Sequence, residues 1–149
     1  MKIYLGADYH GLEKKKLLIQ FLGEQGYPVE DKGAYEYHEG DDYNDPAIAV
    51  SKEVREDAGS VGILVCDSAH GMTIQANRFK GVRAANCSGP DSAVLAREHD
   101  DANILCLSAR IMDDALIKDT VLAFLNTSFT NLERRVRRIN RLDEREDYD

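Results

Sequence analysis

The sequence feature that most constrains the fold of this chain is an apolar segment followed directly by a helix-like segment. Val61 to Val65 form an uninterrupted apolar run that ends at Cys66, and apolar residues at helical spacing follow between Met72 and Ala76. A buried strand that leads straight into a helix is typical of a parallel sheet covered on both faces. Ligands of such sheets bind where strands end and helices begin. The loop here carries a thiol, a hydroxyl and an imidazole, and the free N–H groups of a helix start suit an anion.

The rest of the chain alternates between strand-like and helix-like segments. We expect strands at residues 2–6, around Val29, and at 61–65, 82–85 and 104–107. Helical periodicity marks residues 12–22, closed by Gly23 and Gly26, then 47–55, 90–99, a helix capped by Asp113 or Asp114, and a basic helix at about 132–142. This order predicts an α/β fold with a doubly wound sheet of about five parallel strands. Residues 1–149 are interpreted as one domain, a length at which one core suffices.

Charge and composition limit the classes of binding partner that this chain can have. The net charge of −8 argues against general nucleic-acid binding. No apolar run approaches the roughly 20 residues of a membrane helix. The apolar start at Met1–Gly6 is too short for a signal peptide, so we expect a cytoplasmic protein. Residues from about 131 to 149 combine a basic helix with an acidic end and few apolar side chains, which indicates an arm that reaches a partner subunit.

Cysteine spacing gives neither a disulfide framework nor a zinc site. Cys66, Cys87 and Cys106 have no CxxC pairing and no secretory context, so they are interpreted as reduced thiols. The chain also lacks GxGxxG and GxxxxGK[ST], which leaves a nucleotide-binding module a distant alternative.

The strand ends supply the candidate chemistry. Cys66 is a candidate base or nucleophile because a helix amino terminus favours the thiolate, but a buried strand-end cysteine also serves as a small hydrophobe. Ser68 is a candidate donor to a substrate oxygen or an ordinary helix cap. Further candidates at the same rim are Asp8, Tyr9, His10, His70 and Arg110.

Other candidates lie away from these loops. His99 is flanked by carboxylates and is a candidate acid or base, although histidine is also favoured at a helix carboxyl terminus. It points at the rim only if another subunit supplies it. The arginines of residues 134–141 suit phosphate or a subunit contact. Tyr43 is a candidate for stacking on a sugar ring or a packed loop residue.

Ordered motifs along nearly the whole chain resemble one family, the ribose-5-phosphate isomerase type B and galactose-6-phosphate isomerase family. The motifs are MKIYLGAD, GILVC followed by HGM and QAN, KGVRAA, LAREHDDAN, SARIM and RRVRRI. The resemblance implies a Rossmann-like fold, dimers or tetramers with active sites between subunits, and aldose–ketose isomerisation of sugar phosphates through a cis-enediolate. It implies no metal and no other cofactor.

The resemblance also assigns roles by position. Cys66 matches the base that moves the proton between C1 and C2, Ser68 a hydroxyl that assists ring opening, and His99 the residue that opens the ring from the partner subunit. Asp8 and Tyr43 match substrate contacts, and Gly71 matches the last glycine of a loop that holds the enediolate oxygen. Three matches to phosphate-binding arginines complete the set: Arg110, Arg134 and Arg138.

Several positions depart from the family pattern. The first motif usually reads Asp-His-Ala-Gly but is Asp8-Tyr9-His10-Gly11 here, and Asp67 and Ala69 replace two glycines of the loop that continues through His70 to Gly71. Asp100 stands where the family has Asn, and Arg135 where it has His. Tyr9, Asp67 and Asp100 make the pocket less favourable for an anion, whereas Arg135 acts in the other direction. The leading hypothesis is ribose 5-phosphate isomerisation, with another sugar or a non-catalytic binding subunit as alternatives.

Overall fold

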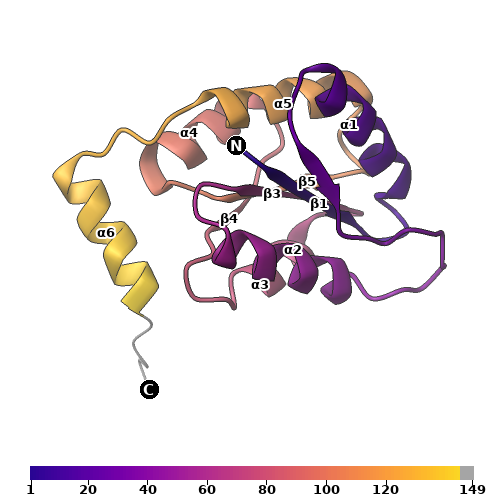
Figure 1. Ribbon diagram of the computed structural model, residues 1–149, viewed down its shortest axis with the longest axis horizontal. Helices are drawn as coiled ribbons and strands as arrows, with labels where there is room; N and C mark the ends of the chain where they lie inside the picture. Colours follow the sequence, from indigo (N-terminus) through magenta and orange to yellow (C-terminus); the bar gives the residue numbers. More distant parts are fainter. Residues whose placement is uncertain (145–149) are drawn as a thin grey trace.

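The computed structural model describes residues 1–144 and contains one five-stranded parallel sheet in the order β2-β1-β3-β5-β4 (Figure 1). The strands are β1 (Ile3–Ala7), β2 (Val29–Asp31), β3 (Val61–Cys66), β4 (Ala84–Asn86) and β5 (Ile104–Ser108). The helices are α1 (Leu12–Glu24), α2 (Asn44–Glu56), α3 (His70–Ala76), α4 (Pro90–Asp100), α5 (Asp114–Asn126) and α6 (Glu133–Glu144). The doubly wound α/β fold predicted from the sequence is confirmed.

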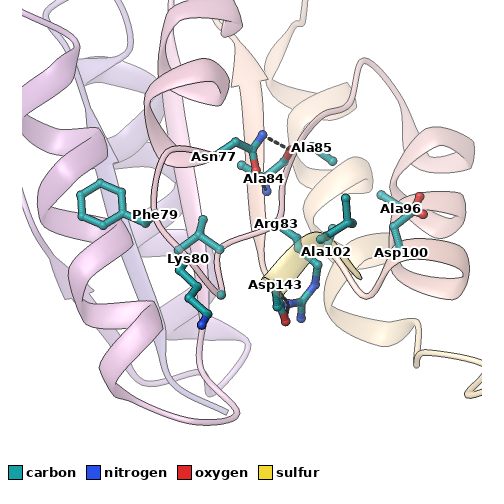
Figure 2. Close-up of a pocket in the computed structure, with 13 residues that line it drawn as sticks. Asn77, Phe79, Lys80, Arg83, Ala84, Ala85, Ala96, Asp100, Ala102 and Asp143 are labelled. Atoms are coloured by element: carbon teal, nitrogen blue, oxygen red, sulfur yellow. Dashed lines mark hydrogen bonds and ion pairs between the residues drawn. The ribbon is translucent and has the colours of Figure 1, made fainter. Parts of the chain in front are cut away.

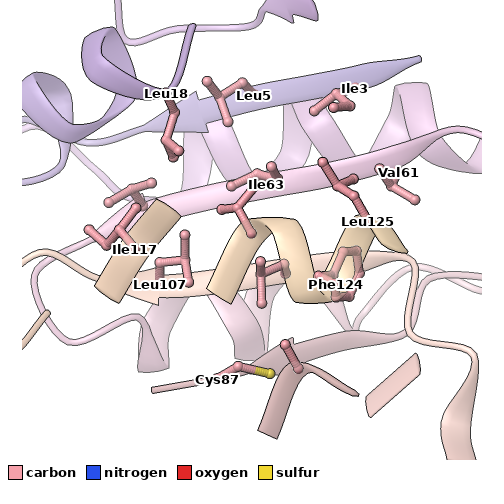
Figure 3. Packing of buried hydrophobic residues seen from close by; sticks show 14 of the residues in the cluster. Ile3, Leu5, Leu18, Val61, Ile63, Cys87, Leu107, Ile117, Phe124 and Leu125 are labelled. Carbon is pink, nitrogen blue, oxygen red and sulfur yellow. The ribbon is translucent and has the colours of Figure 1, made fainter. Parts of the chain in front are cut away.

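Side chains of the sheet alternate between two apolar cores. On one face Ile3, Ile63 and Leu107 pack against α1, α4 and α5, as Figure 3 shows for part of this cluster. On the other face the intervening residues, such as Leu64 and Cys66, pack against α2 and α3. Because both faces are covered, β1, β3 and β5 are buried along their whole length, which explains their continuous apolar sequences.

Three element boundaries differ from the expected ones. Helix α2 begins at Asn44 rather than at residue 47, because Pro46 is accommodated in its first turn, where no backbone N–H is needed. Gly23 lies inside α1, and Gly26, with a φ of +86°, follows the helix end. Strand β4 begins at Ala84 rather than at residue 82, since the N–H of Val82 bonds the carbonyl of Phe79 in a turn.

Helix caps agree better with the sequence. Asp113 is the residue that caps α5, and its carboxylate accepts the N–H of Leu116 at 2.9 Å. This settles the choice between the two neighbouring aspartates.

Cys66, Cys87 and Cys106 are buried free thiols, as their spacing predicted.

Helix α6 projects from the body of the molecule as an arm (Figure 1). Ile139 is the one residue of this helix that is buried. The helix is attached to the body at the end of α4, where the Arg135 guanidinium donates to the Glu98 carbonyl, and near β4, where Arg83 pairs with Asp143 at 3.3 Å. The last part of the predicted arm, residues 145–149, lies outside the described residues. Among the described helices, none is long and apolar enough to cross a membrane.

Candidate active site

The loop between β3 and α3 folds back on the Cys66 thiol. The backbone N–H of Ala69 donates to Cys66 Sγ at 3.1 Å, and Ser68 Oγ accepts the N–H of His70 at 3.3 Å. Ala69 reaches this position in a left-handed conformation with a φ of +71°. Alanine is strained in this conformation, whereas the glycine that the family motif has at this position adopts it without strain. Ser68 is not the helix cap that the sequence suggested, because Ala69 is the N-cap of α3 and no side chain caps this helix; the Ser68 side chain is exposed at the rim.

Cys66 is a protonated thiol in the single chain near neutral pH. Burial, followed by the charge of Asp8, raises the pKa of the thiol to about 11, although the N–H groups of Ala69 and Met72 act in the opposite direction. Its side chain is only 5% exposed. The helix start alone therefore does not produce the thiolate that the sequence suggested.

The loop after β1 approaches the same rim. Asp8 is buried and accepts the N–H of Gly11 at 3.1 Å, and burial raises the pKa of its carboxyl group. His10 Nδ1 lies 3.7 Å from Asp8 Oδ2, and its ring stacks on Tyr9 at 4.0 Å between centroids. Tyr9 in turn meets Tyr37 edge-on. The histidine side chain at this loop is thus held over Asp8 at position 10, one residue later than in the family motif.

Asp67 and Arg110 join the exits of β3 and β5. Arg110 donates from Nε to Asp67 Oδ1 at 3.0 Å and from Nη2 to Asp67 Oδ2 at 2.7 Å. The arginine lowers the pKa of the Asp67 carboxyl group. The negative charge that the sequence placed beside an anion site is therefore paired within the chain.

A pocket of about 260 Å³ opens beside this ion pair. Its lining combines three predicted residues with four that were not singled out: Ser68, His70, Arg110, Asn86, Ser88, Ser108 and Ile111. Asn86 Nδ2 lies 3.0 Å from His70 Nδ1 and orients that ring. The missed residues end or follow β4 and β5, so the rule that strand exits gather at one rim was the available signal for them.

Tyr43 closes the other side of the loop. Its ring, from the residue before α2, lies against Gly71. It is a packed residue that remains 40% exposed, so both interpretations of this tyrosine from the sequence keep support.

Four predicted residues lie elsewhere. His99 and Asp100 are exposed at the end of α4, near the strand starts rather than the strand exits. Asp100 lines a separate pocket of about 390 Å³ with Lys80, Arg83 and the end of α6 (Figure 2). Arg134 and Arg138 are exposed on α6, the helix that Arg135 joins to the end of α4. One chain thus brings together a rim set at the strand exits, whereas His99, Asp100, Arg134 and Arg138 lie at a distance from it. The rim set consists of Asp8, Cys66, Asp67, Ser68, His70 and Arg110.

The rim set can perform acid–base chemistry on an anionic ligand. It offers a thiol, a hydroxyl, N–H groups at a helix start and one guanidinium. No group of three or more histidine, cysteine or acidic side chains with metal-binding geometry occurs among residues 1–144.

Comparisons with known proteins agree on one family. The family model described as Ribose/Galactose Isomerase matches residues 3–142. Ribose-5-phosphate isomerase B of Mycobacterium tuberculosis is 37% identical over 146 residues, which cover 98% of this chain and 90% of that protein. A probable ribose-5-phosphate isomerase B of Mycoplasma pneumoniae is 42% identical over 110 residues, covering 74% and 72% of the two chains.

Solved structures extend the similarity to three dimensions. Ribose-5-phosphate isomerase B from Mycoplasma genitalium, solved with bound ribulose-5-phosphate, superimposes with a TM-score of 0.93 at 35% identity, covering 96% of this chain and 94% of that one. The enzyme from Thermotoga maritima gives a TM-score of 0.92 at 40% identity, covering 97% and 98%.

Proposed function

Because this chain belongs to the ribose/galactose isomerase family, we propose that it interconverts ribose 5-phosphate and ribulose 5-phosphate. One observation carries the proposal: the loop from Cys66 to Gly71 places a thiol, a hydroxyl and helix-start N–H groups at one rim, beside Arg110. Isomerisation needs a base next to the carbonyl and donors for the developing oxyanion. This loop offers both. A cytoplasmic location is part of the same proposal.

Cys66 is the base in this mechanism and moves a proton between C1 and C2 of the open-chain sugar. Ser68 donates to a substrate oxygen, and the N–H groups up to Gly71 face the enediolate oxygen. Since the pKa of the thiol is about 11 in the single chain, the site needs added positive charge before the thiolate forms. No step requires a metal or a redox cofactor.

A second copy of the chain supplies that charge. At the end of the molecule opposite the strand exits, His99 is exposed at the end of α4, and Arg134 and Arg138 are exposed on the arm α6, whose contacts with its own body are few. In a homodimer they complete the partner's rim set, where His99 opens the sugar ring and the arginines hold the phosphate. Guanidinium groups beside the thiol favour its ionised form.

The test is a ketose-formation assay on purified, metal-free protein. Ribose 5-phosphate is compared with allose 6-phosphate, galactose 6-phosphate and free ribose. Preference for ribose 5-phosphate is the expected result. Activity on another sugar alone would make Tyr9, Asp67, Ala69 and Asp100 determinants of a different specificity. No ketose formation from any of these sugars, with retained phosphate binding, would favour the hypothesis of a non-catalytic binding subunit.

A further inference from the structure

The Asp67–Arg110 pair occupies the donors that a phosphate group would use. Both contacts fall on one edge of the guanidinium, at 3.0 Å from Nε and 2.7 Å from Nη2. This two-bond arrangement is also the one by which arginine holds phosphate. Arg110 lines the pocket beside Ser68 and Ser88, so an anion that enters there meets an arginine already paired with a carboxylate.

The backbone around the pair fixes this arrangement before any ligand arrives. The carbonyl of Asp67 accepts both the Ser108 hydroxyl at 2.6 Å and the N–H of Arg110 at 3.2 Å. Strands β3 and β5 are neighbours, with Cys66 opposite Ser108 in the register. The carboxylate and the guanidinium therefore start from adjacent, tied backbone positions, so their pairing costs side-chain but little backbone conformational entropy.

We infer that Asp67 is an intramolecular competitor for the phosphate group of the substrate, and that it sets the affinity of the site by occupying Arg110. The inference rests on the proposed function for the role of Arg110 as a phosphate ligand. Asp67 side-chain exposure is 35% and that of Arg110 is 69%, so the pair is open to solvent. Exposed pairs of this kind are weak, on the order of 1 kcal/mol or less, and a dianion can displace the carboxylate.

Asp67 could either help phosphate binding by orienting Arg110 or oppose it by repelling the phosphate, and the expected free energies favour the second effect. Ordering of one exposed arginine by one carboxylate contributes little. A carboxylate that stays within reach of a phosphate dianion opposes its binding by an amount of similar size or larger, even in water. Removal of the Asp67 charge should therefore tighten phosphate binding rather than weaken it.

The experiment measures binding of inorganic phosphate and of ribose 5-phosphate to the full chain by calorimetry at fixed ionic strength. Asp67→Asn and Asp67→Gly should each lower the Kd of both ligands about threefold to tenfold, whereas free ribose should be unaffected. Glu24→Gln is the matched control for charge removal, because Glu24 is exposed at the far end of α1 and keeps its bond from Gln20. Its Kd values should equal those of the parent protein.

An Arg110→Gln background separates competition for Arg110 from general repulsion. If Asp67 acts by occupying the guanidinium, the gain from Asp67→Asn disappears when Arg110 is absent. Unchanged or weaker binding in both Asp67 variants, or a gain that persists in the Arg110→Gln background, would overturn the inference. Because inorganic phosphate binds without turnover, tighter phosphate binding in an inactive protein supports the inference while refuting the proposed function. Active protein with no tightening refutes the inference alone.

Discussion

Tyr43 covers Gly71 so closely that any side chain at position 71 would have to displace the tyrosine ring. A Cβ atom on Gly71 would lie 2.5 Å from Cζ of Tyr43 and 2.6 Å from Cε1. The ring of Tyr43, the residue before α2, therefore packs on the backbone of the loop whose N–H groups face the proposed enediolate. The glycine is required here by a neighbour from another element, which the local sequence does not reveal.

Gly71→Ala should consequently destabilise the protein and impair activity. We expect the free energy of unfolding to fall by about 1–3 kcal/mol, as for other overpacked sites, when measured by urea denaturation. Tyr43→Ala in the same chain should restore most of that loss because it removes the ring, whereas Tyr43→Phe should restore none. Equal stability of Gly71→Ala with and without the Tyr43 ring would contradict this contact.

Cys66→Ser should abolish isomerisation while preserving the fold. A serine hydroxyl is a far weaker base than a thiolate, and we expect kcat to fall by at least about 100-fold in the ketose-formation assay. Circular dichroism should match the parent protein. Cys87→Ala is the matched control, since Cys87 is another buried thiol but lies in the opposite core. Near-parental activity of Cys66→Ser would remove this residue as the base.

In the single chain the Cys66 thiol should react slowly at neutral pH and faster as the pH rises toward 11, and pairing with a second copy should shift this rise to lower pH. Its pKa of about 11 exceeds the ordinary value of 9.0, so the reactive thiolate is scarce below that range. Alkylation by iodoacetamide, followed residue by residue with mass spectrometry, measures this rate. Asp8→Asn removes a negative charge that raises the pKa of the thiol, so alkylation at pH 8.5 should accelerate. A rate in Asp8→Asn equal to that of the parent would show that burial alone sets this pKa.

Two inactive variants should restore activity to each other when mixed. If His99 serves the partner's Cys66, a dimer of one Cys66→Ser chain and one His99→Asn chain has one intact site and one doubly altered site. Random re-pairing of equal amounts should recover about one quarter of the parental activity. Single-chain sites would recover none. The altered variants kept unmixed are the controls.

Ala69 should tolerate glycine but not a branched side chain. Glycine relieves a left-handed conformation that costs about 1–2 kcal/mol, but it loses a buried methyl group worth about 0.8 kcal/mol and gains freedom in the unfolded chain. The unfolding free energy of Ala69→Gly should therefore stay within about 1 kcal/mol of the parent. Ala69→Val should lose several times more, because a β-branched residue resists a φ of +71°. Equal stability of the two variants would contradict this account.

Much of this molecule follows from the sequence alone because the signals are local or periodic. The apolar run at Val61–Val65, the alternation of strands and helices, and the cap at Asp113 each depend on neighbouring residues. The family motifs also place Cys66, Ser68 and Arg110 at strand exits, and parallel topology brings strand exits to one rim. Strand β4 begins two residues later than predicted, because turn contacts around Val82 outweigh the preference of a β-branched residue for a strand.

Only the tertiary structure determined the properties that depend on contacts between residues far apart in the chain. The Asp67 charge is paired with Arg110, 43 residues away, so its effect on an anion cannot be read from its identity. Burial and Asp8 together raise the pKa of Cys66, against the direction that a helix start implies. His99 lies in a family motif yet apart from the thiol, because α4 runs from the strand exits to the strand starts, and Arg134 lies apart from it on the projecting helix α6. Sequence identifies the chemical groups, but desolvation and charge pairing depend on three-dimensional neighbours.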